Sequence, residues 1–222
     1  MTGFFVTSTG TEIGKTIVSE LFVNGLLRTS SSVGYYKPVA SGCKSSEWGY
    51  RSPDEVEMIQ TTPLEPDDVH STFRFDAPLS PDKAAEREDR SITIDPILDE
   101  YEALKQQYDH LIVEGIGGIA VPFSPTYDVS DLAADLGLPV VMVVASGLGT
   151  ISHTRTAVNY VNQNNTGVSG ILLTPHTGRD IETTNRDHLK EFYPDRSIRL
   201  VPEFDENTRE QAVDLIHESF LE

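Results

Sequence analysis

The chain has 222 residues, of which 38% are hydrophobic, so it can bury the core of one α/β domain but is short for two. Its 35 acidic residues outnumber its 17 basic residues and give a formal net charge of −18, which argues against nucleic acid and membrane surfaces because both are anionic. It has a single cysteine, no run of about 18 apolar residues and no leader pattern at its amino terminus, so we expect a cytoplasmic protein whose residues 1–222 form one domain.

Strand and helix patterns alternate along the first half of the chain. Residues 3–7 form a short apolar run that predicts a strand, and apolar residues at near-helical spacing predict a helix over about 15–27. Residues 33–37 predict a second strand. Between residues 40 and 91 the pattern loosens, and only one helix is predicted there, over 53–60. A loop of that length in a compact domain is usually functional.

The second half is more regular and indicates the fold class. Helices are predicted over 95–108, 129–136, 151–162, 183–192 and 208–221, and strands over 110–114, 140–145, 168–174 and 197–201. Apolar strands that alternate with helices predict an α/β fold of three layers, with a mostly parallel central sheet flanked by helices. Right-handed crossovers place the carboxyl ends of the strands along one edge, where ligands bind near a switch in strand order.

The segment Ser8-Thr9-Gly10-Thr11-Glu12-Ile13-Gly14-Lys15-Thr16 has the strand-to-helix context of a phosphate-binding loop. Backbone N–H groups and the helix dipole would face an anion there, with Lys15 on the β- and γ-phosphates and the Thr16 hydroxyl on Mg²⁺. The strict pattern has glycine in place of Thr9, but Gly10 can supply one unusual backbone conformation and Ser8 is small. An ordinary glycine-capped turn is the less favoured interpretation.

Three charged residues are predicted at the same edge of the sheet. Glu114 ends an apolar strand and is followed by the glycine-rich residues 115–118, which allow close approach to a phosphate or substrate. Asp54 starts the helix in the long loop, where taken alone it is more typical of a helix-start acid than of a metal ligand. Lys37 ends the second strand and its ammonium should face the same edge of the sheet as Lys15, although it could instead extend into solvent. Together they predict a phosphoryl-transfer site with Mg²⁺.

Four segments together resemble the dethiobiotin synthetase family, in order and with matching spacing over nearly the whole chain. They are Thr11 to Thr16, Tyr36-Lys37-Pro38-Val39-Ala40-Ser41-Gly42, Ser52-Pro53-Asp54, and Val113 to Gly118. The second segment is the most specific of the four.

The resemblance implies a P-loop NTPase fold and an ATP- and Mg²⁺-dependent ligase of biotin biosynthesis. Members close the ureido ring of dethiobiotin from 7,8-diaminopelargonic acid and CO₂, through a carbamate and a carbamic-phosphoric anhydride. It also implies a homodimer whose substrate site lies at the subunit interface.

The resemblance also assigns roles to individual residues. The catalytic set is Thr11, Lys15, Lys37 and Ser41, with Lys37 bridging carbamate and γ-phosphate, and the metal set is Thr16, Asp54 and Glu114. The nucleotide set is Glu12, Ile13, Gly14, Lys15, Thr16, Ile17, Asp54, Glu114, Gly115, Ile116, Gly117, Thr174, Pro175, Pro202, Glu203 and Phe204. The substrate set is Lys37, Ser41, Gly117 and Ser152.

The chain departs from the family pattern at three positions. Ser8 stands where glycine is usual, and Ser152 stands where an asparagine often precedes the histidine near the substrate carboxylate. Thr174 stands where an asparagine reads the nucleotide base, so we expect loose base selectivity, because a hydroxyl offers fewer hydrogen bonds than an amide.

The sequence favours two other functions less, and its acidic surface has two interpretations. A partitioning or site-selection switch ATPase usually has a second lysine early in the phosphate loop, which residues 8–13 lack. An amidotransferase-type ligase acting on corrinoid carboxylates would need room for a glutaminase domain. The acidic residues are spread along the chain, so a fold adapted to high salt and an ordinary acidic cytoplasmic enzyme both remain open.

Overall fold

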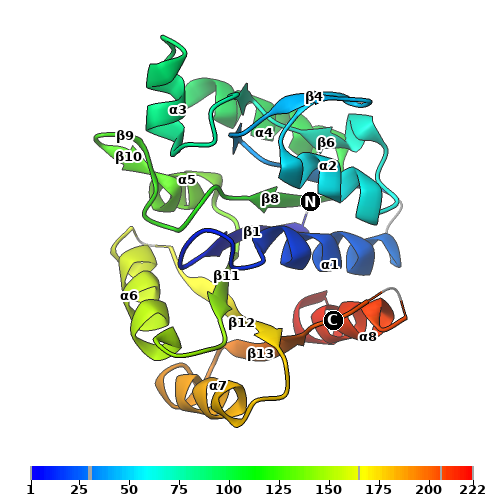
Figure 1. Cartoon of the computed structure of the whole chain (residues 1–222), viewed down its shortest axis with the longest axis vertical. Coiled ribbons are helices and arrows are strands. Elements are labelled where there is room, and N and C mark those ends of the chain that lie inside the picture. The colour runs from blue at the N-terminus through cyan, green and yellow to red at the C-terminus, as the bar shows by residue number, and fades with distance from the viewer. Residues whose placement is uncertain (1, 30–31, 165, 206, 222) are drawn as a thin grey trace.

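A seven-stranded parallel sheet forms the centre of the molecule (Figure 1). The computed structural model describes residues 2–29, 32–164, 166–205 and 207–221. The sheet contains β1 (Thr2–Ser8), β2 (Val33–Tyr36), β6 (Val69–His70), β8 (His110–Glu114), β11 (Val140–Ala145), β12 (Val168–His176) and β13 (Ser197–Pro202). Their order is β13-β12-β11-β1-β8-β2-β6, and each neighbouring pair is parallel. The predicted α/β fold with a mostly parallel sheet is confirmed.

Helices cover both faces of this sheet because its strands are apolar on both sides. One hydrophobic core lies under α1 (Lys15–Leu27), α2 (Pro53–Thr61) and α8 (Arg209–Ile216) and includes Val6, Phe22 and Met58. A second core lies on the opposite face and includes Phe5 and Leu132. Its helices are α4 (Asp95–Gln107), α5 (Val129–Leu136), α6 (Thr150–Gln163) and α7 (Asp180–Phe192). The neighbouring strand residues Phe5 and Val6 thus enter opposite cores, as the strand period of two requires.

The strand order reverses at β1, which has β11 on one side and β8 on the other. The chain leaves β1 for β2, two places away, and returns to β8 before it crosses to β11. The carboxyl ends of β1, β2, β8 and β12 therefore lie along one edge, at the switch point where open parallel sheets bind ligands.

Sequence reasoning missed most of the structure between residues 40 and 91. The helix predicted over 53–60 is confirmed as α2, but the seven-residue helix α3 (Pro81–Arg87), a 3₁₀ turn (Pro66–Asp68) and the edge strand β6 were not predicted. The segment also holds two small ribbons, β3 (Val39–Ala40) with β7 (Phe73–Arg74), and β4 (Lys44–Ser46) with β5 (Gly49–Arg51). Strands of two or three residues are too short to carry a periodic pattern. The same reason explains the missed hairpin of β9 (Pro122–Ser124) and β10 (Tyr127–Asp128).

The end of the chain also differs from the prediction. The closing helix was expected over 208–221, whereas the α-helix ends at Ile216 and a π-helical turn follows over His217–Leu221. No helix among the described residues is both long and apolar enough to cross a membrane.

Candidate active site

The phosphate loop joins β1 to α1 at the switch point of the sheet. Gly14 is the residue before α1 and has φ of 91°, a left-handed conformation that glycine adopts without steric cost. Because Gly14 has no side chain to cap the helix, the first N–H groups of α1 remain available for an anion. Glu12 also has a positive φ, of 56°, which is uncommon for a residue with a side chain.

Ser8 links the phosphate loop to the loop after β8. Its hydroxyl oxygen lies 2.5 Å from the carbonyl oxygen of Gly10 and 3.0 Å from that of Gly117, which share its one proton, and it accepts a hydrogen bond from the ammonium of Lys15 at 3.3 Å. The departure from glycine at this position therefore adds three contacts to the loop. The expectation that Gly10 supplies the unusual backbone conformation is wrong, because the positive φ angles lie at Glu12 and Gly14.

Lys37, Asp54 and Glu114 meet opposite the phosphate loop. The ammonium of Lys37 lies 2.8 Å from Asp54 Oδ2 and 2.8 Å from Glu114 Oε1. Glu114 is fully buried and also accepts hydrogen bonds from Thr16 Oγ1 at 3.1 Å and Ser19 Oγ at 2.7 Å. Four parts of the chain thus converge on one point: β8, α1, α2 and the residue that follows β2. Lys37 does not extend into solvent.

The charges of this cluster support one another. Burial opposes the charge on Lys37, but the carboxylates of Glu114 and Asp54 outweigh burial and raise the pKa of Lys37 above its ordinary value. Lys37 in turn is the main cause that lowers the pKa of Asp54. Burial, followed by repulsion from Lys37, lowers the pKa of Lys15. An anion bound between the two lysines would relieve their repulsion.

A cavity of about 410 Å³ contains the charged cluster and the phosphate loop. The predicted residues in its wall are Thr11, Glu12, Ile13, Gly14, Lys15, Thr16, Ile17, Lys37, Ser41, Asp54, Glu114, Ile116 and Gly117. Glu57 also lines it and was not predicted. The signal was available, because Glu57 lies three residues after Asp54 and therefore on the same face of α2.

A second cavity, of about 400 Å³, adjoins the first because Ile17 and Glu57 line both. It brings together the predicted nucleotide residues Thr174, Pro175, Pro202, Glu203 and Phe204 from the ends of β12 and β13. Glu20, Thr61 and Arg209 complete the wall and were missed. Arg209 forms an ion pair with Glu20, and its guanidinium lies 5.4 Å from the centre of the Phe204 ring. No sequence pattern marks Arg209, since it reaches the cavity only through tertiary folding.

A third cavity, of about 440 Å³ and mostly apolar, lies on the other side of the phosphate loop. Thr11 lines both this cavity and the first. Ile119, Ala120 and Val121 contribute apolar surface, and α6 contributes His153, Thr156, Ala157 and Tyr160. Two predicted residues lie outside the walls of the three cavities. Ser152 is exposed in the first turn of α6, and the backbone N–H of Gly115 donates to Val6.

The oxygen atoms of Thr16, Asp54 and Glu114 fit a magnesium ion. Mg²⁺ prefers hard oxygen ligands and takes only a few from protein, with the rest from water and phosphate. Within the described part of the chain no group of three or more His, Cys, Asp or Glu could hold a metal ion alone. The carboxylates of Asp54 and Glu114 converge on the ammonium of Lys37, and the Thr16 hydroxyl lies beside Glu114. This set of oxygen atoms suits a metal that also binds a nucleotide phosphate.

The phosphate loop lies at the switch point of a parallel sheet and faces a buried lysine and two carboxylates. This arrangement places the protein in the P-loop nucleotide-binding class. The AAA domain family model matches residues 2–211. An ATP-dependent dethiobiotin synthetase of Bacillus licheniformis is 34% identical over 97% of this chain and 92% of its own length. That of Bacillus subtilis subsp. natto is 31% identical over 97% and 94%. The chain belongs to the dethiobiotin synthetase family.

A solved structure of a nucleotide-binding protein with ADP from Archaeoglobus fulgidus covers 100% of this chain and 88% of its own. Its TM-score of 0.49 and sequence identity of 15% are too low to bear on function.

Proposed function

We propose that this protein is an ATP- and Mg²⁺-dependent cyclo-ligase of biotin biosynthesis. It would form the ureido ring of dethiobiotin from 7,8-diaminopelargonic acid and CO₂. The observation that carries this proposal is the position of Lys37, which lies in one cavity with the phosphate loop and Ser41. Membership of the dethiobiotin synthetase family supports the choice of substrates.

The proposed reaction has three steps. One amine of the substrate adds to CO₂ and loses a proton, which gives a carbamate. A carbamate oxygen then attacks the γ-phosphorus of ATP and displaces ADP, which gives a carbamic-phosphoric anhydride. The second amine attacks the carbonyl carbon of this anhydride, loses a proton and releases phosphate as the ring closes.

The two lysines of the cavity suit this reaction because carbamate and triphosphate are both anionic. They have to approach to about 3.5 Å, so positive charge is needed between them. Lys37 and Lys15 enter the cavity from different elements and can supply that charge from two sides. Ser41 and Thr11 line the same cavity. Ser41 would contact the carbamate or the reacting amine, and Thr11 would lie beside the reacting centre.

Thr16, Asp54 and Glu114 would hold the magnesium ion, as their oxygen atoms fit it. Mg²⁺ bound there would neutralise charge on the β- and γ-phosphates. The displacement of Lys37 from the two carboxylates would then free its ammonium for the reacting groups. The nucleotide base would lie in the cavity of Thr174, Pro175 and Phe204.

The apolar cavity beside Thr11 suits the aliphatic chain of the diamine, and it adjoins Gly118 and α6. We further propose a homodimer in which the partner subunit contributes to the substrate site, a cytoplasmic location, and a single catalytic domain over residues 1–222. Light scattering coupled to gel filtration would test the dimer, since a monomer that is fully active would contradict it.

The most direct test measures phosphate release by purified protein with Mg²⁺-ATP and bicarbonate, with and without the diamine. We expect release to depend on the diamine and to match the ureido product one to one, with ¹³C from labelled bicarbonate in that product by mass spectrometry. Rapid hydrolysis without diamine, stimulated instead by DNA or lipid, would favour a switch ATPase.

A further inference from the structure

Glu55 is a fully buried carboxylate next to Asp54, and it contacts neither the phosphate loop nor Lys37. Its Oε2 accepts hydrogen bonds from the backbone N–H of Ser52 at 2.9 Å and from the Ser52 hydroxyl at 3.1 Å. The Ser52 hydroxyl in turn accepts one from the backbone N–H of Glu55 at 3.3 Å. This capping box fixes the first turn of α2.

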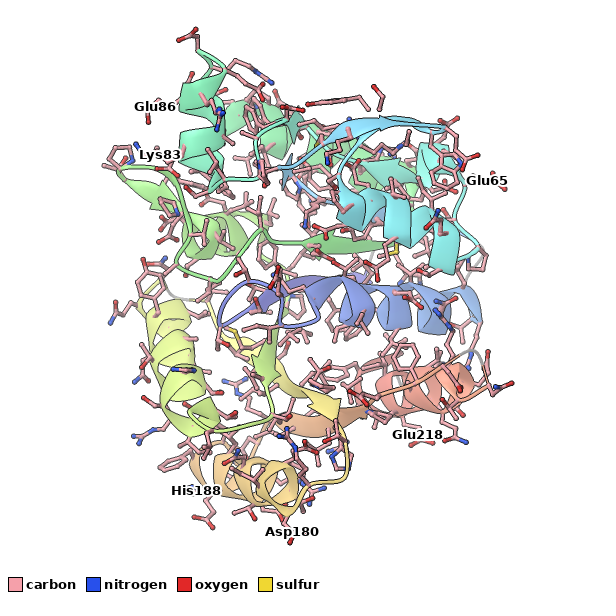
Figure 2. All side chains as sticks on the ribbon, viewed as in Figure 1. Glu65, Lys83, Glu86, Asp180, His188 and Glu218 are labelled. Carbon is pink, nitrogen blue, oxygen red and sulfur yellow. The ribbon has the colours of Figure 1, made fainter. Side chains whose placement is uncertain are left out.

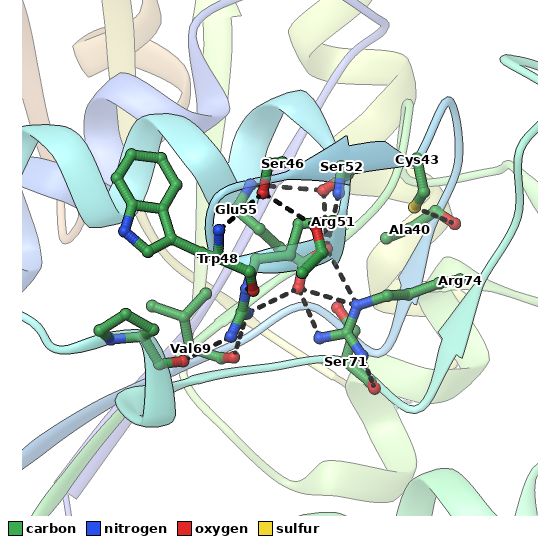
Figure 3. A network of polar contacts seen from close by, with 12 residues as sticks. Ala40, Cys43, Ser46, Trp48, Arg51, Ser52, Glu55, Val69, Ser71 and Arg74 are labelled. Atoms are coloured by element: carbon green, nitrogen blue, oxygen red, sulfur yellow. Dashed lines mark hydrogen bonds and ion pairs between the residues drawn. The ribbon is translucent and has the colours of Figure 1, made fainter.

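Two arginines close over the same carboxylate (Figure 3). Arg74 contacts Glu55 Oε1 through Nη2 at 2.6 Å and through Nε at 3.1 Å, and Arg51 reaches Oε1 through Nη1 at 3.3 Å. Both guanidinium groups also donate to backbone carbonyls. Arg51 donates to Val69 at 2.8 Å, and Arg74 donates to Ser71 at 3.2 Å. The arginines therefore anchor Glu55 to the backbone of the segment that contains β6 and β7.

Arg74 also connects this cluster to the strand that leads to Ser41. It lies opposite Ala40 in the pairing of β7 with β3, and the N–H of Phe75 donates to the carbonyl of Ala40 at 2.9 Å. One short strand thus holds the start of α2 through Glu55 and the approach to Ser41 through the backbone. Two parts of the cavity wall that are separate in sequence share this support.

Asp54 and Glu55 are consecutive in a helix, so their side chains point about 100° apart around its axis. Glu55 faces the arginines, whereas Asp54 faces Lys37 at 2.8 Å. Holding Glu55 therefore sets the rotation of α2 and with it the direction of the Asp54 carboxylate, which is itself 39% exposed. We propose that Glu55, held by Arg74 and Arg51, is a positioning residue that aims Asp54 at the metal site.

This inference rests on the proposed function, because it takes Asp54 as a magnesium ligand. The test uses Mn²⁺ as the probe, with a non-hydrolysable ATP analogue and without diamine or bicarbonate. Electron paramagnetic resonance gives the dissociation constant of Mn²⁺, and fluorescence titration gives that of the analogue without metal. We expect Glu55→Gln, which keeps the shape but removes the charge, to weaken Mn²⁺ binding by about tenfold or more. Analogue affinity without metal should stay within about twofold.

Two comparisons separate positioning from loss of stability. Met58→Ala removes buried volume from the same helix but none of the hydrogen-bonding partners of Glu55, so it should lower the melting temperature with little effect on Mn²⁺ affinity. In an Asp54→Asn background the effect of Glu55→Gln on Mn²⁺ should vanish, because the two residues act through one ligand.

If Glu55→Gln fails to fold, Arg74→Lys decides the question, since it keeps the charge and loses the planar fork. It should weaken Mn²⁺ binding in the same direction. The inference is overturned if either folded variant loses stability but binds Mn²⁺ like the wild type, or if the effects of Glu55→Gln and Asp54→Asn are additive. If Asp54→Asn alone leaves Mn²⁺ affinity unchanged, the proposed metal site itself fails, and the positioning role fails with it.

Discussion

The side chain of Lys37 is 2% exposed, and its ammonium is held by two carboxylates 2.8 Å away. Such a group is costly to bury without partners, and its carboxylate partners are the same residues that fit the metal. We expect Lys37→Gln to lower kcat by about 10²–10³, or roughly 3–4 kcal/mol, because Lys37 meets charge that develops between carbamate and γ-phosphate. ATP affinity should change little, since in the proposed site Lys15 and the loop amides would hold the triphosphate.

Steady-state kinetics and the dissociation constant of ATP measure these two effects separately. Lys44→Gln, which removes an exposed lysine from β4, is the control and should leave both unchanged. A large loss of ATP affinity with kcat intact would make Lys37 a phosphate anchor and nothing more.

Thr174 lines the cavity in which we propose that the nucleotide base lies. Its single hydroxyl offers less than the donor and acceptor pair of an asparagine amide. We expect the wild type to prefer ATP over CTP and GTP by less than about a hundredfold in kcat/KM, and Thr174→Asn to increase that preference. A stronger preference in the wild type would identify another reader in the same cavity, with Arg209 and Glu20 the first to examine.

At this scale the sequence could predict the residues whose chemistry is local. The phosphate-loop pattern predicts Lys15 and Thr16, and the end of an apolar strand predicts Glu114. The three residues line one cavity. Ser8 and Glu55 could not be predicted in the same way. Besides its local contacts, Ser8 bonds to Gly117, which lies 109 positions away. Besides its local capping box with Ser52, Glu55 bonds to Arg74, which a strand too short to have a pattern brings in.

Among the elements, the loop after β8 and the phosphate loop are held in close contact. A Cβ on Gly118 would lie 3.2 Å from the Gly10 N and Cα atoms and 3.3 Å from the carbonyl carbon of Thr9. These are backbone atoms, so a side chain at Gly118 has to displace the phosphate loop. We therefore expect Gly118→Ala to weaken ATP binding by about tenfold, since a small misplacement of preorganised groups is costly.

Isothermal titration calorimetry with ATP would measure this loss. Gly147→Ala is a matched control, because a Cβ on Gly147 meets nothing within 4 Å and its φ is not left-handed. If Gly118→Ala binds ATP like the wild type, the phosphate loop tolerates displacement and the contact has no part in nucleotide binding.

The edge strand β6 introduces a pH dependence through His70. Burial lowers the pKa of His70 below 6.5, with Glu100 and Asp68 opposing this effect and Arg51 and Arg74 adding to it. His70 Nε2 also lies 3.0 Å from the Tyr108 hydroxyl. Because the unfolded chain binds the proton more readily, stability is lost as the pH falls through the window just below 6.5.

Urea unfolding at pH 7.5 and pH 5.0 would show this loss as a lower midpoint at pH 5.0. The difference between the two midpoints should be smaller in His70→Gln, in which this side chain no longer titrates. An equal difference in both proteins would mean that His70 is not the source of the pH dependence.

The long elements of the sheet and the helices on its faces could be predicted because each carries a sustained apolar pattern. Between residues 40 and 91 only α2, with Asp54 at its start, could be predicted as an element, and the strands and turns that hold Ser41 and Glu55 in place could not. The small ribbons of this segment depend on backbone pairing with distant partners, such as Ala40 with Arg74. The part of the site that sequence reasoning described least is therefore the part that we propose aligns Asp54 with the approach to Ser41.

For the whole molecule, the dominant feature is the net charge of −18. Charged side chains such as Glu65, Glu86, Asp180 and Glu218 lie around the whole outline of the molecule (Figure 2). Some acids are paired, as in the exposed contact of Lys83 with Glu86, but an exposed pair contributes only about 0–1 kcal/mol. Repulsion among the unneutralised acids should therefore lower the stability of the folded state when it is not screened.

Salt separates the two interpretations of this acidic surface. The distance over which charges interact falls from about 10 Å at 0.1 M salt to about 3 Å at 1 M. If repulsion is a substantial term, the urea midpoint should rise from 0.1 to 1 M KCl while the m-value stays constant. A matched variant carries lysine in place of the exposed Glu47, Glu191 and Glu218, and each substitution replaces one negative charge with one positive charge. This variant should be more stable than the wild type at 0.1 M KCl and should respond less to added salt, because it has less repulsion to screen.

A wild-type midpoint that stays constant or falls with KCl would show that the acidic surface does not limit stability at low salt. The protein would then be an ordinary acidic enzyme instead of one adapted to high salt.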